Sequence, residues 1–226
     1  MPDPAPRLTV ATRTGRVRII AEADAPLQVR GGDVVSQPDG SLSVESGDRG
    51  RGELHIRCAA GTDVLVGTST GRVELRGTVG DARVTTRTGR ISVEAAGTVD
   101  LRSSSGRIEV GECSGDCRVV TRTGSVTVGS AGAAEIVTET GSVTARDVEA
   151  ATIHSGTGRV EIGTGAPPRV TVRTHSGSVE IAVPEGSHPE TRLTSRSGRV
   201  RCECEPGHDG AIDVETGSGR IRVTCV

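Results

Sequence analysis

One glycine-centred pattern recurs along most of this chain and limits the folds open to it. The pattern reads aliphatic-x-Thr/Ser-x-Thr/Ser-Gly-Arg/Ser-Val/Ile-x-aliphatic, and from its second copy onward the glycines are 17 to 21 residues apart. Chance does not produce ten such copies, so each one is a structural repeat. The repeat glycines are Gly15, Gly71, Gly89, Gly106, Gly124, Gly141, Gly158, Gly177, Gly198 and Gly219.

Side chains alternate within each repeat with a period of two, which predicts β-strands. From Ala82 to Thr88 the even positions carry apolar or hydroxyl side chains, while Arg83 and Arg87 lie on the other face. After Gly89 the apolar series resumes at Ile91, three residues beyond Thr88 instead of two. This change of phase predicts a tight corner at the glycine.

A single repeat cannot bury its own apolar face, but repeats stacked in parallel at about 4.8 Å can bury them together. We therefore predict an all-β fold, a single-domain parallel β-solenoid (β-helix) over 1–226. It has about twelve coils of 17–21 residues and is right-handed by the general rule for parallel crossovers. Residues 1–62 form irregular N-terminal coils, and 63–226 form the regular repeats.

The 56 residues between Gly15 and Gly71 amount to nearly three periods, which predicts two irregular coils between these glycines. Aliphatic residues with alternating spacing mark their expected buried positions. These are Leu27, Val29, Leu42, Val44, Leu54 and Ile56.

Thr or Ser occupies the positions three and one residues before the repeat glycines, as in Thr86 and Thr88. Both columns share parity with the buried aliphatic position, so we expect inward hydroxyl ladders that bond to the next coil or to backbone near the corner. The alternative is an outward Thr-x-Thr face like that of antifreeze solenoids. That face would bury intervening charged residues such as Arg87.

Composition removes several classes of function. Aromatic residues are absent and the formal net charge is −2, so stacking on bases and global attraction to polyanions are both missing, and nucleic-acid binding is not expected. We read no signal peptide at the start and no apolar run long enough for a membrane span. The expected location is the cytoplasm, with envelope association through a partner as a further possibility.

Outward arginines follow many repeat glycines and are mostly balanced by glutamates, but the balance fails near the end of the chain. Five arginines gather there in the last two predicted coils, with few acidic residues near them. They form a candidate anion-binding patch for a polyanion or glycan. The residues are Arg196, Arg199, Arg201, Arg220 and Arg222.

The cysteines and histidines suggest no chemistry. The spacing of the six cysteines does not match a zinc site, and we expect thiols, with a Cys204–Cys225 disulfide as the alternative because these two hold equivalent positions in adjacent repeats. The five histidines, including the outward His154 and His175, have no nucleophile or carboxylate at a recognisable spacing. We predict no catalytic residues, no cofactor and no metal.

The Ser/Thr-Gly-Arg/Ser-Val-x-Val units, together with Ile181–Gly186 and the analogous Ile56–Gly61, resemble the bacterial β-strand-repeat family labelled "putative adhesin". The resemblance covers nearly the whole chain, most clearly 54–226. It implies a β-solenoid without catalytic residues, and in some members an association with the cell envelope or its stress response. The shared motif is structural, so no functional residue is carried over.

The final strand runs from Gly219 to the last residue, Val226, and leaves nothing to cover the last predicted coil. An open strand edge favours pairing with another chain. We therefore predict a non-enzymatic structural or interaction protein that binds a protein partner or itself through the solenoid ends. The alternatives are a self-assembling scaffold like the bactofilins, and a polyanion or glycan binder through the arginine patch.

Overall fold

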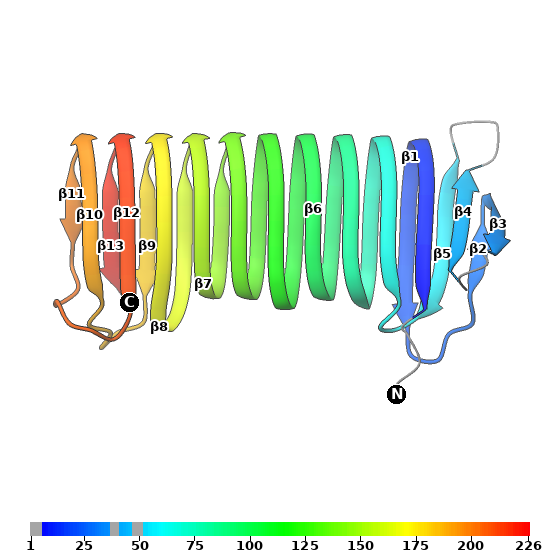
Figure 1. The fold of residues 1–226 in the computed structure, drawn as a ribbon, viewed down its shortest axis with the longest axis horizontal. Helices are drawn as coiled ribbons and strands as arrows, with labels where there is room; N and C mark the ends of the chain where they lie inside the picture. Colours follow the sequence, from blue (N-terminus) through cyan, green and yellow to red (C-terminus); the bar gives the residue numbers. More distant parts are fainter. Residues whose placement is uncertain (1–5, 37–40, 47–51) are drawn as a thin grey trace. The chain divides into compact units, whose positions relative to one another are not determined.

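The computed structural model describes residues 6–36, 41–46 and 52–226. The described residues are mostly β-strand and contain no helix, which confirms the all-β prediction. Thirteen strands are assigned to one sheet (Figure 1). The chain divides into two compact units, Met1–Ser114 and Gly115–Val226, and strand β6 (Asp63–Thr140) runs through both. The single domain stays a prediction.

Each unit has its own strands besides its part of β6. The first contains β1 (Arg7–Glu22), β2 (Gln28–Arg30), β3 (Gly32–Ser36), β4 (Leu42–Ser46) and β5 (Glu53–Ala59). The second contains β7 (Val143–Thr157), β8 (Val160–Ser176), β9 (Val179–Val183), β10 (Glu190–Ser197), β11 (Val200–Cys202), β12 (Ala211–Ser218) and β13 (Ile221–Cys225).

Repeats in the second unit pair in parallel, as predicted, and in register except around Val148, where the pairing of β7 with β8 shifts. Ile136 of β6 pairs with Ile153 of β7, which pairs with Val172 of β8, and all three side chains are fully buried. These are the aliphatic residues five positions before successive repeat glycines. Figure 1 shows segments on either side of a corner in two layers, with β10 and β12 in front of β11 and β13. The core between the layers is a column of Val, Ile, Leu and Ala.

The hydroxyl columns differ from the prediction in two respects, their hydrogen bonding and the exposure of one position. The residue three before the glycine is buried, as predicted, in repeats such as those of Thr86, Thr138 and Thr174, which rules out an outward Thr-x-Thr face. Thr86 donates to the backbone carbonyl of Thr88 at 3.5 Å, but the buried hydroxyls of Thr138 and Thr174 have no hydrogen-bond partner among the described residues, so the predicted bonding ladder is not general. The residue one before the glycine, such as Thr88, was expected inward but is exposed, because the chain already turns at the corner there.

Corner glycines allow the repeats to approach closely. Gly158 has a φ of 145°, and a Cβ placed on it would overlap the carbonyl oxygen of Gly141 in the neighbouring repeat. The backbone conformation and the lack of space both exclude a side chain. The same relation holds between Gly141 and Gly124.

In the first unit the order of the strands differs from their order in the chain. The repeat of Gly15, on β1, pairs directly with the repeat of Gly71, on β6. Strands β4 and β5 pair with the other edge of β1, so the prediction of two coils between these glycines was wrong. Strands β2 and β3 then pair antiparallel with β5 and β4.

The expected buried positions in this irregular region are only partly confirmed. Val44, Leu54 and Ile56 are buried, as predicted. Val29 and Leu42 are half-buried, and Leu27 is 36% exposed. The reason is their place in the order: Val29 lies on β2, which pairs with β5 alone among the described strands, and Leu27 precedes β2.

The second unit has the same kind of inversion at the end of the chain. Strand β12 lies between β8 and β10, and β13 lies between β9 and β11. The final strand is therefore inside the sheet, and the prediction that it forms the open edge was wrong. The edge is formed by β10 and β11 (Figure 1).

Hydrophobicity explains this inversion. The inward positions of the inserted strands include Ile212 and Val223, which are no more than 1% exposed. Their partners in the edge strands are Thr191 and Cys202. Covering Ile and Val while leaving Thr and Cys at the edge removes more apolar surface from water than the reverse order would.

We expect Gly158→Ala to lower the free energy of unfolding by about 3 kcal/mol, because it adds both backbone strain and an overlap with Gly141. Urea unfolding followed by circular dichroism measures the change. Gly165→Ala is the matched control, since a Cβ there meets nothing within 4 Å. Equal losses in the two variants would contradict the close approach at the corner.

We expect cysteines at Glu180 and Arg222 to form a disulfide in a Cys202→Ser background, because these residues are paired in register. Glu180→Cys with Arg201→Cys is the control, since β13 separates β9 from β11. Mass spectrometry of the oxidised, digested protein identifies the bond. Bonding in the control pair instead would show that the repeats follow chain order.

Candidate interaction surfaces

The edge formed by β10 and β11 is the first candidate surface. Among the described strands, β10 pairs only with β12 and β11 pairs only with β13. One side of each therefore presents backbone N–H and C=O groups without a strand partner. Such an edge is a template for pairing with another chain.

Core-type side chains of the edge strands are partly uncovered. Leu193 is half-buried and Val200 is 40% exposed. Their partners in the inserted strands, Val214 and Ile221, are fully buried. Cys202, the partner of Val223, is also exposed. The edge lacks the next layer that covers equivalent residues elsewhere in this unit.

The structure brings together four of the five predicted patch arginines. Arg201 and Arg222 are paired in register on β11 and β13, and Arg199 and Arg220 directly precede these strands. All four are exposed. Arg222 binds Glu203 at 2.9 Å, whereas the other three form no ion pair with described residues.

Arg196 is separated from this cluster. It lies on β10, before the corner at Gly198, and therefore in the other layer. The repeat predicted that these arginines would lie in neighbouring repeats, but the corner places them on two faces. Next to Arg222 on the far side is Glu180 of β9, which limits the basic cluster in that direction.

A groove of about 500 Å³ runs across the face of β7, β8, β12 and β10 and reaches the end of β6. Its charged and titratable lining residues are His154, Arg173, His175, Arg196 and Glu215. Both histidines are exposed, as their outward parity predicted. This groove was not predicted from the sequence. Its lining includes Gly156 and Gly217, which have no side chain to fill the space on the outer face.

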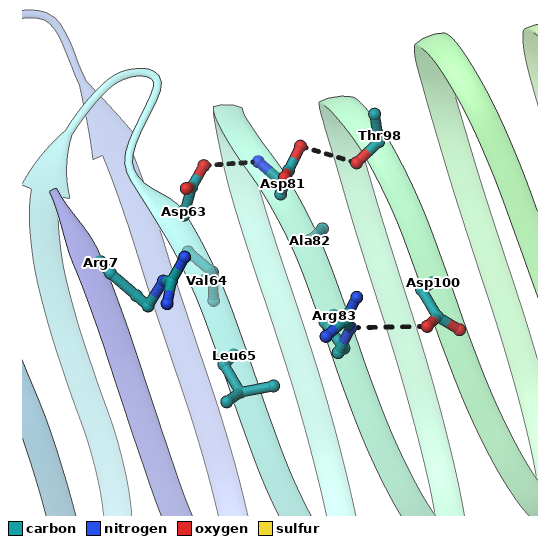
Figure 2. Close-up of a pocket in the computed structure, with 9 residues that line it drawn as sticks. All are labelled: Arg7, Asp63, Val64, Leu65, Asp81, Ala82, Arg83, Thr98 and Asp100. Atoms are coloured by element: carbon teal, nitrogen blue, oxygen red, sulfur yellow. Dashed lines mark hydrogen bonds and ion pairs between the residues drawn. The ribbon is translucent and has the colours of Figure 1, made fainter. Parts of the chain in front are cut away.

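A smaller pocket of about 200 Å³ lies on the first unit (Figure 2). Its polar groups bind one another: Asp63 accepts from the backbone N–H of Asp81 at 2.9 Å, and the Thr98 hydroxyl donates to Asp81 at 2.7 Å. Arg83 lies 3.4 Å from Asp100. These contacts join neighbouring repeats. Over the part of the chain that the structure describes, no group of His, Cys, Asp and Glu is arranged to hold a metal ion.

Glu74 is the centre of an ion-pair network on the first unit. Arg18 donates to it at 3.1 Å, and Arg72 lies at 3.6 Å. Burial acts to raise the pKa of Glu74, but the hydrogen bond and charge of Arg18, helped by Arg16 and Arg72, outweigh it and hold the pKa below its ordinary value. The network connects β1 and β6 and stabilises their pairing.

Glu53 and His55 form a smaller cluster next to this network. The hydrogen bond from His55, together with Arg16, lowers the pKa of Glu53 against the opposing effect of burial. Glu53 also lies 3.3 Å from Arg16. The cluster joins β5 to β1.

Two of the six cysteines, Cys204 and Cys225, differ from the expectation of thiols. They form the disulfide that the sequence analysis gave as the alternative, because equivalent positions of adjacent repeats come within bonding distance. Cys58, Cys113 and Cys117 are buried. Burial raises the pKa of the Cys58 thiol, with a hydrogen bond to Thr62 acting in the opposite direction.

No helix in the described residues could cross a membrane.

We expect Glu74→Gln to destabilise the protein by about 1 kcal/mol at neutral pH. The folded pKa is below the unfolded one, so the contribution is complete above the unfolded value and is lost as pH falls through the folded value. Wild type and variant should therefore converge in strongly acidic urea titrations. Glu149→Gln is the control, since Glu149 is exposed and makes no ion pair with described residues. A difference that persists in acid would contradict the assignment.

Comparison with known proteins gives only distant likenesses. No protein-family model and no curated protein matches the chain. A crystal structure of a "putative adhesin" from Bacteroides fragilis aligns with 98% of this chain and 93% of its own, at 14% identity and a TM-score of 0.47. A "putative cell adhesion protein" from Clostridium sporogenes aligns with 97% and 92%, at 11% identity and a TM-score of 0.21. Likenesses at this level leave family membership an expectation.

Proposed function

We propose that this protein is a non-enzymatic interaction scaffold, a right-handed parallel β-solenoid of about twelve coils whose β10–β11 edge binds a protein partner. The in-register pairing of successive repeats supports the solenoid. The narrow aliphatic core supports a structural rather than a catalytic role, because it leaves charged side chains on the outer faces.

One observation carries the choice of binding surface. Leu193, Val200 and Cys202 are inward-type residues, yet the structure leaves them partly exposed beside unpaired backbone groups. A chain that added a strand there would both satisfy the backbone and cover these side chains. Strand addition needs no pocket, which fits the shallow grooves elsewhere on this unit.

The cellular location is also a proposal. The sequence-based expectation is the cytoplasm, with envelope association through a partner. The Cys204–Cys225 disulfide instead favours an oxidising compartment, where such bonds persist. We propose an envelope-associated protein on this ground.

A second candidate function is binding of a polyanion or glycan. The observation that favours it is the exposed group of Arg199, Arg201 and Arg220, which form no ion pair with described residues. Contacts there would be to phosphate, sulfate or carboxylate groups, and salt would weaken them. Strand addition at the edge would depend on salt much less.

We expect Val200→Lys to abolish retention of the partner from a lysate of the native host, because a charge on the inward face of β11 opposes strand addition. Val34→Lys is the matched control, since Val34 on β3 is also an exposed valine, at 45%. Mass spectrometry compares the proteins retained by wild type and by each variant.

Three outcomes of this comparison are informative. Proteins kept by wild type and Val34→Lys but lost by Val200→Lys support the proposal. Identical retention by all three contradicts it. Material that all three retain and that high salt releases favours the polyanion reading.

A further inference from the structure

We infer that the partner of the β10–β11 edge is a second copy of this chain, bound about a two-fold axis with β10 antiparallel to β10 of the second copy and Leu193 at the centre. This inference rests on the proposed function, since it names the occupant of the same edge. A two-fold axis brings the same surface of both copies together and closes the assembly at two.

Alternation of the side chains limits the registers that β10 can adopt with itself. Residues directly opposite in an antiparallel pair point to the same face, so inward residues must meet inward residues. With Leu193 opposite Leu193 of the second copy, Thr191 meets Ser195. All three residues are half-buried and inward-type in the structure. This register pairs β10 from Glu190 to Arg196 and leaves out one residue, Ser197.

Charge selects the same register. With Leu193 at the centre, Glu190 lies opposite Arg196 of the second copy, and symmetry gives two such pairs. A shift that centres Thr194 places Arg192 opposite Arg196 twice, and a shift that centres Arg192 places it opposite itself. Opposite charges across a strand pair stabilise it and like charges destabilise it. Glu190, Arg192 and Arg196 are all exposed and form no ion pair with described residues, so each is available.

The second layer fits the same axis. Leu193 lies five residues before Gly198 and Cys202 lies four residues after it, so their distances from the corner differ by one residue. Pairing β11 antiparallel about Cys202 places Arg201 opposite Glu203 of the second copy. The pairing can include Glu203, because its N–H already donates to the carbonyl of Val223 at 2.9 Å and continues the strand.

The edges of the first unit do not offer the same fit. Its outer strands β2 and β3 run antiparallel to their neighbours and contain three and five residues, against eight in β10. Two copies of the β10–β11 edge can pair along their length only if the strands of the second copy run in the opposite direction. A two-fold axis produces this arrangement. We therefore infer a closed dimer and no filament.

Charge exchange in the full-length chain tests the pairing. Sedimentation equilibrium should show a reversible dimer for wild type. Glu190→Arg alone and Arg196→Glu alone should each raise the dimer Kd at least about tenfold, because each creates two like-charge contacts. The combined variant Glu190→Arg/Arg196→Glu should restore the wild-type Kd. Circular dichroism confirms that each variant is folded.

A covalent readout gives a second, independent test. Oxidised glutathione should convert the two Cys202 thiols across the axis into an intermolecular disulfide; its S–S bond breaks, and it takes up the two electrons and the two protons to become two molecules of glutathione. A dimer band in non-reducing electrophoresis should form in wild type and be absent in Cys202→Ser. Leu193→Cys in the Cys202→Ser background should restore it through the other layer.

A wild-type chain that stays monomeric at all concentrations overturns the inference, as does a dimer insensitive to both single charge reversals. Failure of the combined variant to recover overturns the register centred on Leu193. A monomeric wild type that still loses a host protein on Val200→Lys overturns the dimer and leaves the interaction scaffold standing. Loss of neither host protein nor dimer on that substitution counts against both.

Discussion

The close approach of one corner glycine to the next governs this structure. Because the carbonyl of Gly141 occupies the space that a Cβ on Gly158 would need, these two backbones meet in one register. Equivalent positions near the glycine are therefore aligned between successive repeats. These positions are the aliphatic residues five before the glycine, the buried hydroxyls three before it, and the charged residues between them. A substitution at the corner therefore disturbs neighbours on both sides as well as its own repeat.

Exact stacking of equivalent positions also means that outward charges meet their equivalents. In some columns opposite charges are neighbours, as in Arg83 with Asp100 and Arg118 with Glu135, whereas Glu161 is paired in register with Glu180. At the end of the second unit Arg201 lies beside Arg222. Glu203 relieves this contact only in part, by binding Arg222.

Features that depend on local residue spacing could be predicted from the sequence. The spatial order of the repeats could not, because it depends on which repeats compete for the same neighbour. Strand type, the parallel register and the buried aliphatic column follow from period-two alternation and the corner glycines, and these were confirmed. The order of repeats at each end was wrong, because chain order is the default assumption for neighbouring strands. It would have been recoverable by comparing the inward residues: Ile212 and Val223 are more apolar than Thr191 and Cys202. The separation of Arg196 from the other four arginines also follows from the corner at Gly198.

The insertion of β12 between β8 and β10, and of β13 between β9 and β11, affects the order in which the second unit can form. The ribosome synthesises β10 and β11 before β12 and β13, which are their neighbours in the sheet. These two strands remain without their native neighbours until β12 and β13 have emerged, so this part of the second unit cannot be built strand by strand in chain order. Until β12 and β13 are present, the edges of β8 and β9 that pair with them have no strand neighbour on that side.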